Sequence, residues 1–222
     1  MIKGIWKYNT SSNDFREVDD TVESRYIREC NRESDINEHL PVLYRYATEC
    51  ETIIECGVRK CVSSWALVHG LLNNGKEKKK ILLNDIDKCD IHELLYRTAN
   101  LPIEINYQWI NNLELNITTN YDMIFIDTWH VYGHLKRELA KFAPVINKYI
   151  IMHDTTVDEF EGETIRERLN ARAQAEISGY PLEEINCGIG KAITEFLEAN
   201  SEWYVKERLT NNNGLTILER KN

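Results

Sequence analysis

The chain has no long apolar run and no excess of positive charge. No hydrophobic segment approaches the ~18 residues that a membrane span needs, and the segment Met1–Trp6 lacks the apolar stretch of a signal peptide. Lys and Arg total 27 against 36 Asp and Glu, which gives a net charge of −9. Because nucleic-acid backbones are bound through basic patches, we expect a soluble cytoplasmic protein with neither a nucleic acid nor a membrane as partner.

Cysteine and glycine are sparse and follow no known ligand-binding spacing. The six cysteines form no CxxC pair and no zinc-finger pattern, so reduced thiols in a cytosol-like compartment are expected. The ten glycines include neither a GxGxxG motif nor a Walker loop. These absences argue against a disulfide scaffold, a zinc finger and a pyrophosphate-binding protein.

What the chain does have is an alternation of apolar runs and helical patterns. Strands are predicted at 52–55, 81–83, 103–107, 123–126 and 149–152, and helices at 22–32, 63–72, 90–99, 131–142, 163–178 and 190–199. Residues 34–47 also have helical spacing, which Pro41 interrupts with a kink or a fresh helix start. Such alternation predicts βαβ units and a parallel sheet.

The C-terminal runs 203–209 and 214–218, around Asn211–Asn213, predict an antiparallel hairpin. We expect one α/β domain over residues 1–222, with a Rossmann-like, doubly wound, mostly parallel sheet in residues 51–222. Residues 1–50 are expected to form a helical segment, and its polar first 20 residues are either loosely held or a lid.

Candidate ligand-binding residues lie at the ends of the first three predicted strands. Gly57 lets the backbone approach a ligand closely, and Glu55 beside it would repel phosphate but could pair with an ammonium group. Asp85 falls where an acidic residue accepts hydrogen bonds from a ribose. Trp109 either stacks on adenine or fills the core. This set indicates an adenosine ligand without a pyrophosphate, such as S-adenosylmethionine, although a plain turn glycine and a solvated aspartate are the alternatives.

Acid and imidazole groups follow the fourth and fifth strands. Asp127 ends one strand with His130 three residues later, and His153 and Asp154 end the next. Ligands of open α/β sheets bind at this edge. The aspartates could instead cap helices, and His130 could be a packed or surface imidazole. His153 is either a metal ligand or a neighbour of the ligands.

Several segments together resemble a known family. The matching segments are Ser34–Ala47, Ile54–Arg59 with Ser63–Trp65, Phe125–Tyr132, Met152–Thr155 and Asn211–Leu218. They look like a class I S-adenosylmethionine-dependent methyltransferase, closest to the sugar and small-molecule O-methyltransferases related to the cephalosporin-biosynthesis and macrolide-sugar enzymes. The Asp-x-x-His motif with the 153–154 pair is the most specific part of the resemblance.

The resemblance implies roles for individual residues. The turn and the residues after it (Glu55, Cys56, Gly57 and Ser63) would bind the methionine part of the cofactor, Asp85 the ribose, Asp127, His153 and Asp154 a divalent metal, and His130 would be the general base, with Asp127 beside it. The chain departs from the family at two points. Cys61 replaces a glycine, and His153-Asp154 replaces a Glu-Asp pair, which shifts the expected metal from Mg²⁺ toward Mn²⁺.

The sequence therefore predicts an S-adenosylmethionine-dependent, metal-assisted O-methyltransferase of a sugar or glycosylated small molecule. A metal that chelates two neighbouring hydroxyls lowers the pKa of one of them, and a neutral imidazole can take the proton. The alternatives are a non-catalytic adenosine-nucleoside-binding protein and a methyltransferase of aromatic diols. The oligomeric state, and whether the chain is part of a larger glycan-building polypeptide, stay open.

Overall fold

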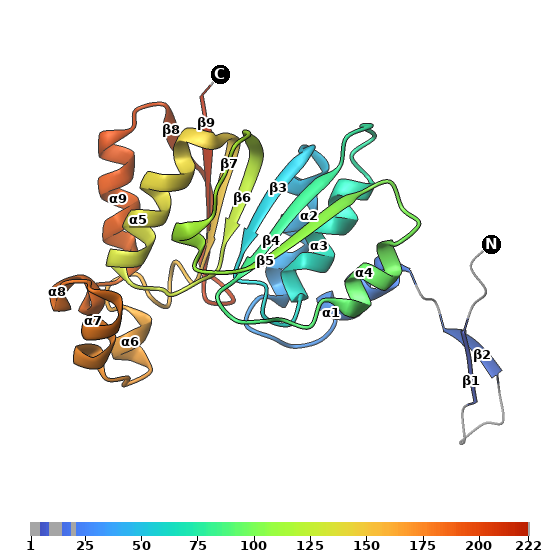
Figure 1. Cartoon of the computed structure of the whole chain (residues 1–222), viewed down its shortest axis with the longest axis horizontal. Coiled ribbons are helices and arrows are strands. Elements are labelled where there is room, and N and C mark those ends of the chain that lie inside the picture. Colours follow the sequence, from blue (N-terminus) through green and yellow to red (C-terminus); the bar gives the residue numbers. More distant parts are fainter. Residues whose placement is uncertain (1–4, 9–14, 19–20, 222) are drawn as a thin grey trace.

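A seven-stranded sheet forms the centre of the molecule (Figure 1). The computed structural model describes residues 5–8, 15–18 and 21–221. The strands are β3 (Thr52–Cys56), β4 (Lys80–Asp85), β5 (Glu104–Trp109), β6 (Tyr121–Ile126), β7 (Ile146–His153), β8 (Trp203–Leu209) and β9 (Leu215–Arg220). Their order is β5-β4-β3-β6-β7-β9-β8, and only the pairings of β9 are antiparallel.

Helices cover both faces of this sheet. One face carries α1 (Val22–Cys30), α2 (Leu40–Thr48), α3 (Val62–Leu72) and α4 (His92–Thr98), and the other carries α5 (Tyr132–Phe142) and α9 (Ile189–Ala199). Three short helices, α6 (Glu163–Arg166), α7 (Ala171–Ser178) and α8 (Leu182–Asn186), follow β7. Single 3₁₀ turns lie at Asn37–His39, Asn112–Glu114 and Ala143–Val145.

The central strands are apolar on both faces because helices cover both. On β6, Met123 and Phe125 belong to the core under α1–α4, whereas Ile124 and Ile126 belong to the core under α5 and α9. Strands that are buried on both faces read as continuous hydrophobic runs. This explains why the sequence shows an uninterrupted apolar segment there.

The chain reverses direction across the sheet between β3 and β6. From β3 it proceeds outward to β4 and β5, and then returns to place β6 on the other side of β3. Ligands of doubly wound sheets bind at such a switch point, outside the carboxyl ends of the strands. Gly57 and Asp127 follow the two strands that meet there.

The predicted fold class is confirmed, with the parallel sheet and the C-terminal hairpin in place. The predicted helix 163–178 is wrong, because it is divided into α6 and α7. Arg168 adopts φ 55° and ends the first helix, and the Asn170 side chain caps the second. Pro41 lies in the first turn of α2. Of the two predictions made for this proline, a kink or a fresh helix start, the fresh start is confirmed.

The N-terminal residues form a separate hairpin of β1 (Ile5–Tyr8) and β2 (Phe15–Val18). The polar run Asn9–Asn13, whose composition predicts a turn, lies outside the described residues. All six cysteines are free thiols, as expected. Among the described residues, no helix is long and apolar enough to cross a membrane.

Candidate active site

The turn after β3 has three residues in a backbone conformation that favours glycine, although only one of them is a glycine. Gly57 has φ 96°, and Arg59 and Cys61 also lie in the left-handed region, with φ 45° and 61°. A Cβ on Gly57 would lie 1.8 Å from the carbonyl oxygen of Asp127, so only glycine allows the tips of β3 and β6 to meet. The Cys61 side chain is buried in the core, where it starts α3.

Asp85 at the end of β4 holds this turn in place. Its Oδ2 accepts hydrogen bonds from the backbone N–H groups of Val58 and Arg59, both at 2.9 Å, and its Oδ1 accepts one from Asp87. The predicted ribose contact therefore comes from a carboxylate that already organises the loop. A carboxylate oxygen has two acceptor sites, and the two loop N–H groups already use both sites of Oδ2, so a ribose hydroxyl would have to donate to Oδ1.

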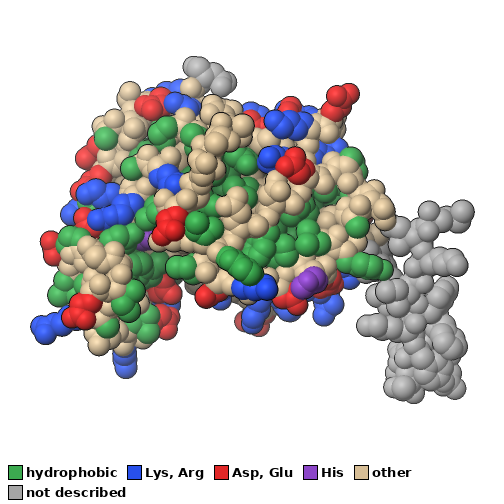
Figure 2. Space-filling model, in the orientation of Figure 1, with side chains coloured by type: hydrophobic (Ala, Val, Ile, Leu, Met, Phe, Trp, Pro, Cys, Tyr) green, Lys and Arg blue, Asp and Glu red, His purple; other side chains and the backbone are tan. Residues whose placement is uncertain are grey.

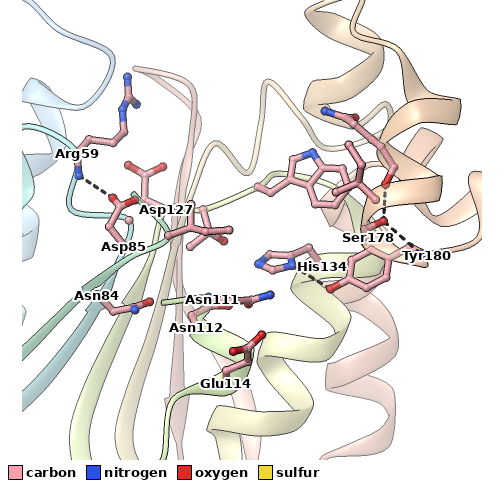
Figure 3. A pocket seen from close by; sticks show the side chains of 16 residues that line it. Arg59, Asn84, Asp85, Asn111, Asn112, Glu114, Asp127, His134, Ser178 and Tyr180 are labelled. Carbon is pink, nitrogen blue, oxygen red and sulfur yellow. Dashed lines mark hydrogen bonds between the residues drawn. The ribbon is translucent and has the colours of Figure 1, made fainter. Parts of the chain in front are cut away.

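Two cavities meet at the switch point. The larger, of about 670 Å³, runs from Asn84 and Asp85 past Asn112 to Trp129 and Tyr180 (Figure 3). The smaller, of about 330 Å³, is bordered by residues 32–36 and by the turn after β3. Both cavities are lined by Gly57, Arg59 and Asp127, so together they form one crevice of the size typical of small-molecule sites.

The inserted helices after β7 form the outer wall of the larger cavity. Gln174, Ile177 and Ser178 of α7 and the following Tyr180 line it opposite Asp85. In Figure 2 the surface is hollowed between this helical segment and the rest of the molecule. The wall contains no buried residue of α7, so the helix contributes a cover rather than a core element.

The predicted cofactor residues are divided between the crevice and its support. Ser63 lines the smaller cavity and donates a hydrogen bond to Glu55, whose burial raises its pKa to about 8. Cys56 is fully buried in the core. Trp109 is not among the residues that line the larger cavity: it is 52% exposed at the end of β5, with the ammonium of Lys88 over its ring. The exposed side chain that does border the cavity beside Asp85 is Ile86.

The three predicted metal ligands come together. His153 Nδ1 lies 3.5 Å from Asp127 Oδ1 and 3.2 Å from Asp154 Oδ1, and one donor atom from each residue falls within 4.8 Å of the others. Asp154 has φ 57°, and its buried Oδ1 accepts no hydrogen bond from the described residues, although it lies within ion-pair distance of His153 Nδ1. A buried acceptor without a donor, beside an imidazole and a second carboxylate, is a donor set that fits a divalent cation.

His130 lies within hydrogen-bond reach of the same carboxylates. Its Nε2 lies 3.2 Å from Asp127 Oδ1, and its Nδ1 lies 2.9 Å from Asp154 Oδ2 and 3.4 Å from Asp158 Oδ2. Burial opposes a charge on the ring, but the three carboxylates outweigh it and hold the pKa of His130 well above 6.5. Burial likewise opposes ionisation of Asp127, and the two histidines hold the pKa of Asp127 far below its usual range.

Two groups of site residues were not predicted from the sequence. The first is Asp158, which is fully buried and receives two hydrogen bonds from Arg166, at 2.7 and 3.0 Å. Glu163 lies near it, with its carboxylate 3.8 Å from His130 Nδ1. The sequence did contain a sign of this residue: Asp158 follows Asp154 by four residues, and one turn of chain can bring both carboxylates to the same side.

The second group surrounds Glu138, which does not line the larger cavity itself but contacts residues that do. The buried carboxylate of Glu138 accepts hydrogen bonds from Asn112 and from Thr128, and lies 3.4 Å from His134. His134 in turn lies 3.2 Å from the hydroxyl of Tyr180. Only the helical spacing of His134 and Glu138 was visible in the sequence, since the other partners come from distant loops.

The last turn of the chain closes the site from a further side. Asn212 and Asn213 have φ 45° and 70°, as expected of residues in the hairpin turn. His39 is fully buried there, with Nε2 3.0 Å from the carbonyl oxygens of Asn211 and Asn212, and its ring packs edge-on against His153. His39 is therefore a buried neighbour of the donor set.

Comparison with solved structures agrees with this architecture. The methyltransferase PaMTH1 of Podospora anserina, solved with S-adenosylhomocysteine, is 15% identical with a TM-score of 0.55, and each chain is covered completely. The O-methyltransferase TomG of Streptomyces achromogenes, solved with S-adenosylmethionine, is 12% identical with a TM-score of 0.57 over 93% of this chain and 92% of its own. The O-methyltransferase of Bacillus cereus, solved with S-adenosylhomocysteine, is 16% identical with a TM-score of 0.51 over 92% of both chains.

The chain thus has the class I S-adenosylmethionine-dependent methyltransferase fold. No protein-family model matches the sequence, and a search of curated proteins finds no match. Other structural neighbours are described as O-methyltransferases or as an N-methyltransferase. At these identities the likeness concerns the fold, so the reaction has to be argued from the site.

Proposed function

We propose that this chain is an S-adenosylmethionine-dependent O-methyltransferase that uses a divalent cation, Mn²⁺ or Mg²⁺, and methylates a sugar hydroxyl of a glycan or glycosylated small molecule. The observation that supports the proposal is the double position of Asp127. This residue lines both cavities and also belongs to the buried donor set with His153 and Asp154. A cofactor in the crevice and a cation on the donor set would therefore meet at one carboxylate.

The reaction assigns the chain two tasks. Methyl transfer is an in-line displacement: the acceptor oxygen bonds to the methyl carbon while the bond from that carbon to sulfur breaks, and the acceptor loses its proton. The chain has to hold the two reactants in line and accept the proton. The crevice at the switch point supports the first task, since its larger cavity suits the nucleoside and its smaller one the amino-acid end.

The donor set supports the second task. Asp127, His153 and Asp154 would hold the cation, and the imidazole among them favours Mn²⁺ over Mg²⁺. A divalent cation bound there would supply acidification of a bound hydroxyl, and it would offset the charge of the carboxylates that raise the pKa of His130. We assign to His130 the role of proton acceptor, with Asp127 orienting its Nε2 at 3.2 Å.

The polarity of the outer wall supports a sugar as the acceptor. Gln174, Ser178 and Tyr180 offer hydrogen-bonding groups, which suit a polyol. A second candidate acceptor, an aromatic diol, is favoured by the indole of Trp129, which lies 5.9 Å from the Tyr180 ring at an interplanar angle of 15°. A non-catalytic nucleoside-binding protein would not need the donor set.

The test is a methyl-transfer assay with S-adenosylmethionine labelled in its methyl group, on a panel of free and glycosidic sugars and catechols. We expect product only with Mn²⁺ or Mg²⁺, and loss of at least 100-fold in turnover for His130→Ala with S-adenosylhomocysteine affinity retained. Asp154→Ala should lose both metal binding and activity. Full activity in chelator would exclude the metal role. Product from catechols, but from none of the sugars, would identify an aromatic diol as the acceptor.

A further inference from the structure

The turn between β8 and β9 lies against the proposed cation site. The carbonyl oxygen of Asn212 in this turn lies 3.2 Å from Nε2 of His153 and 3.0 Å from Nε2 of His39. Both rings are buried, at 1% and 0% exposure. Because a carbonyl oxygen only accepts hydrogen bonds, each Nε2 donates an N–H, and the two bonds use both lone pairs of this oxygen.

This contact decides which nitrogen of His153 can bind a metal. A neutral imidazole has one N–H and one lone pair, and a metal ligand requires the lone pair. With the proton on Nε2, the lone pair is on Nδ1, which lies 3.2 Å from Asp154 Oδ1 and 3.5 Å from Asp127 Oδ1. A glutamate in place of His153 would need no such control, because both of its carboxylate oxygens are acceptors.

The segment that precedes α2 holds the Asn212 carbonyl in place. The Asn212 side chain accepts a hydrogen bond from the backbone N–H of Glu38 at 3.0 Å and donates one to the carbonyl of Ser34 at 2.9 Å. The Asn212 backbone has φ 45°, a conformation that asparagine tolerates better than most residues. His39 adds a third contact, because its Nε2–H is shared between the carbonyls of Asn211 and Asn212. The orientation of the Asn212 carbonyl is therefore fixed from outside the turn.

Packing alone does not explain the imidazole of His39. Its Nδ1 is buried and has no hydrogen-bond partner among the described residues, which costs stability that an apolar side chain of similar size would not cost. The His39 ring meets the His153 ring edge-on, with the two centroids 5.5 Å apart. What the imidazole supplies to the structure is the Nε2–H that the turn accepts.

We propose that His39 and Asn212 position His153 as an Nδ1 ligand of the cation, with the Asn212 carbonyl as the group that keeps the proton on Nε2. The inference rests on the proposed function, since it presupposes the cation. His39 and Asn212 are positioning residues, because they act through His153 and not on the cation or the reacting atoms. A hydrogen bond of this kind to a metal-binding histidine typically strengthens metal binding by about 10- to 100-fold.

The experiment measures the affinity for Mn²⁺ and identifies its ligands. The electron paramagnetic resonance signal of free Mn²⁺ gives the dissociation constant, and pulsed measurements detect the coupling of a bound imidazole nitrogen to the metal. We expect this coupling in the wild type and its absence in His153→Glu. Asn212→Gly accepts the positive φ and loses the side-chain contacts, so it should bind Mn²⁺ about 10- to 100-fold more weakly.

Asn213→Gly is the matched control and should bind Mn²⁺ like the wild type. Asn213 lies in the same turn and also has positive φ, at 70°. It accepts hydrogen bonds from the N–H groups of Thr156 and Val157 through its backbone carbonyl, which glycine keeps.

Two comparisons separate positioning from a general effect on the fold. In a His153→Glu background the ligand has no N–H to place, so the addition of Asn212→Gly should leave the Mn²⁺ affinity unchanged. In the wild-type background, His39→Leu removes the N–H donor and should weaken Mn²⁺ binding, whereas His39→Gln keeps a donor and should retain it.

Four results would overturn the assignment and leave the proposed function intact, because the wild type would still bind Mn²⁺. They are wild-type affinity in Asn212→Gly, an equal loss from Asn212→Gly in both backgrounds, equal affinities of His39→Leu and His39→Gln, and an imidazole coupling that persists in His153→Glu. A wild type that does not bind Mn²⁺ would overturn both proposals.

Discussion

Gly57 has no side chain, and this allows the loops that follow β3 and β6 to lie in contact. Gly57 allows the carbonyl of Asp127 to approach to a distance that no Cβ tolerates. The same contact places Asp127 between the cavities and the donor set. Its neighbours Arg59 and Cys61 share the left-handed conformation without being glycines. Forming this turn therefore costs conformational free energy at both residues.

Replacing Gly57 with alanine should therefore be far more costly than an ordinary glycine substitution. The positive φ and the collision with Asp127 O together should lower the free energy of unfolding by at least about 3 kcal/mol. Gly75→Ala is the matched control, because Gly75 has φ 69° but no atom within 4 Å of the added Cβ. It should lose only about 1–2 kcal/mol. Urea denaturation measures both, and equal losses would show that the contact with Asp127 does not matter.

Glu55 should give the cofactor-free protein a distinctive pH dependence. Burial raises its pKa from 4.5 to about 8, so between these values the folded state keeps a proton that the unfolded state has released. This contribution to stability is complete below about pH 4.5 and declines as the pH rises to about 8, by up to about 1.4 kcal/mol per pH unit. The wild type minus Glu55→Gln difference in unfolding free energy, measured from pH 5 to 9, isolates it. A difference that grows with pH would contradict the assignment.

At the scale of elements, the sequence was informative where local pattern decides structure. The buried strands were found because apolar, β-branched runs have few alternatives, and their polar ends located Asp127, His153 and Asp154 at one edge. The division of residues 163–178 was missed, since nothing in a helical pattern reveals that Arg168 adopts φ 55°. Residues such as Tyr180 and Asn112 could not be assigned to the site, because only tertiary packing brings them to Glu138 and His134.

The helix α7 should depend on its cap, because none of its residues is buried. The Asn170 side chain accepts a hydrogen bond from the N–H of Ala173 at 3.1 Å. Losing such a cap costs about 1 kcal/mol, so Asn170→Ala should speed amide hydrogen exchange in residues 171–178 about fivefold and leave global unfolding unchanged. Asn170→Asp keeps the acceptor and should exchange like the wild type. Protection that is unaffected in Asn170→Ala would mean that other contacts hold α7.

At the scale of the whole molecule, the two halves of the sheet meet at a shared carboxylate. The half with β3, β4 and β5 provides the turn, Asp85 and half of the residues that line the larger cavity, and the half with β6 and β7 provides the cation donors. Since Asp127 belongs to both, the proposed cofactor and cation cannot bind independently. Any effect of one on the affinity of the other must be reciprocal.

The charge of the cofactor gives this coupling a sign. S-adenosylmethionine carries a sulfonium that S-adenosylhomocysteine lacks, and a positive charge near the donor set of Asp127, His153 and Asp154 opposes a second cation. Mn²⁺ should therefore bind more weakly to the complex with S-adenosylmethionine than to the complex with S-adenosylhomocysteine, and the difference should shrink as salt screens it. Calorimetric titration of Mn²⁺ into both complexes at low and high salt measures the effect. Equal Mn²⁺ affinities in the two complexes at low salt would mean that the cation site and the methyl donor lie too far apart for the proposed reaction.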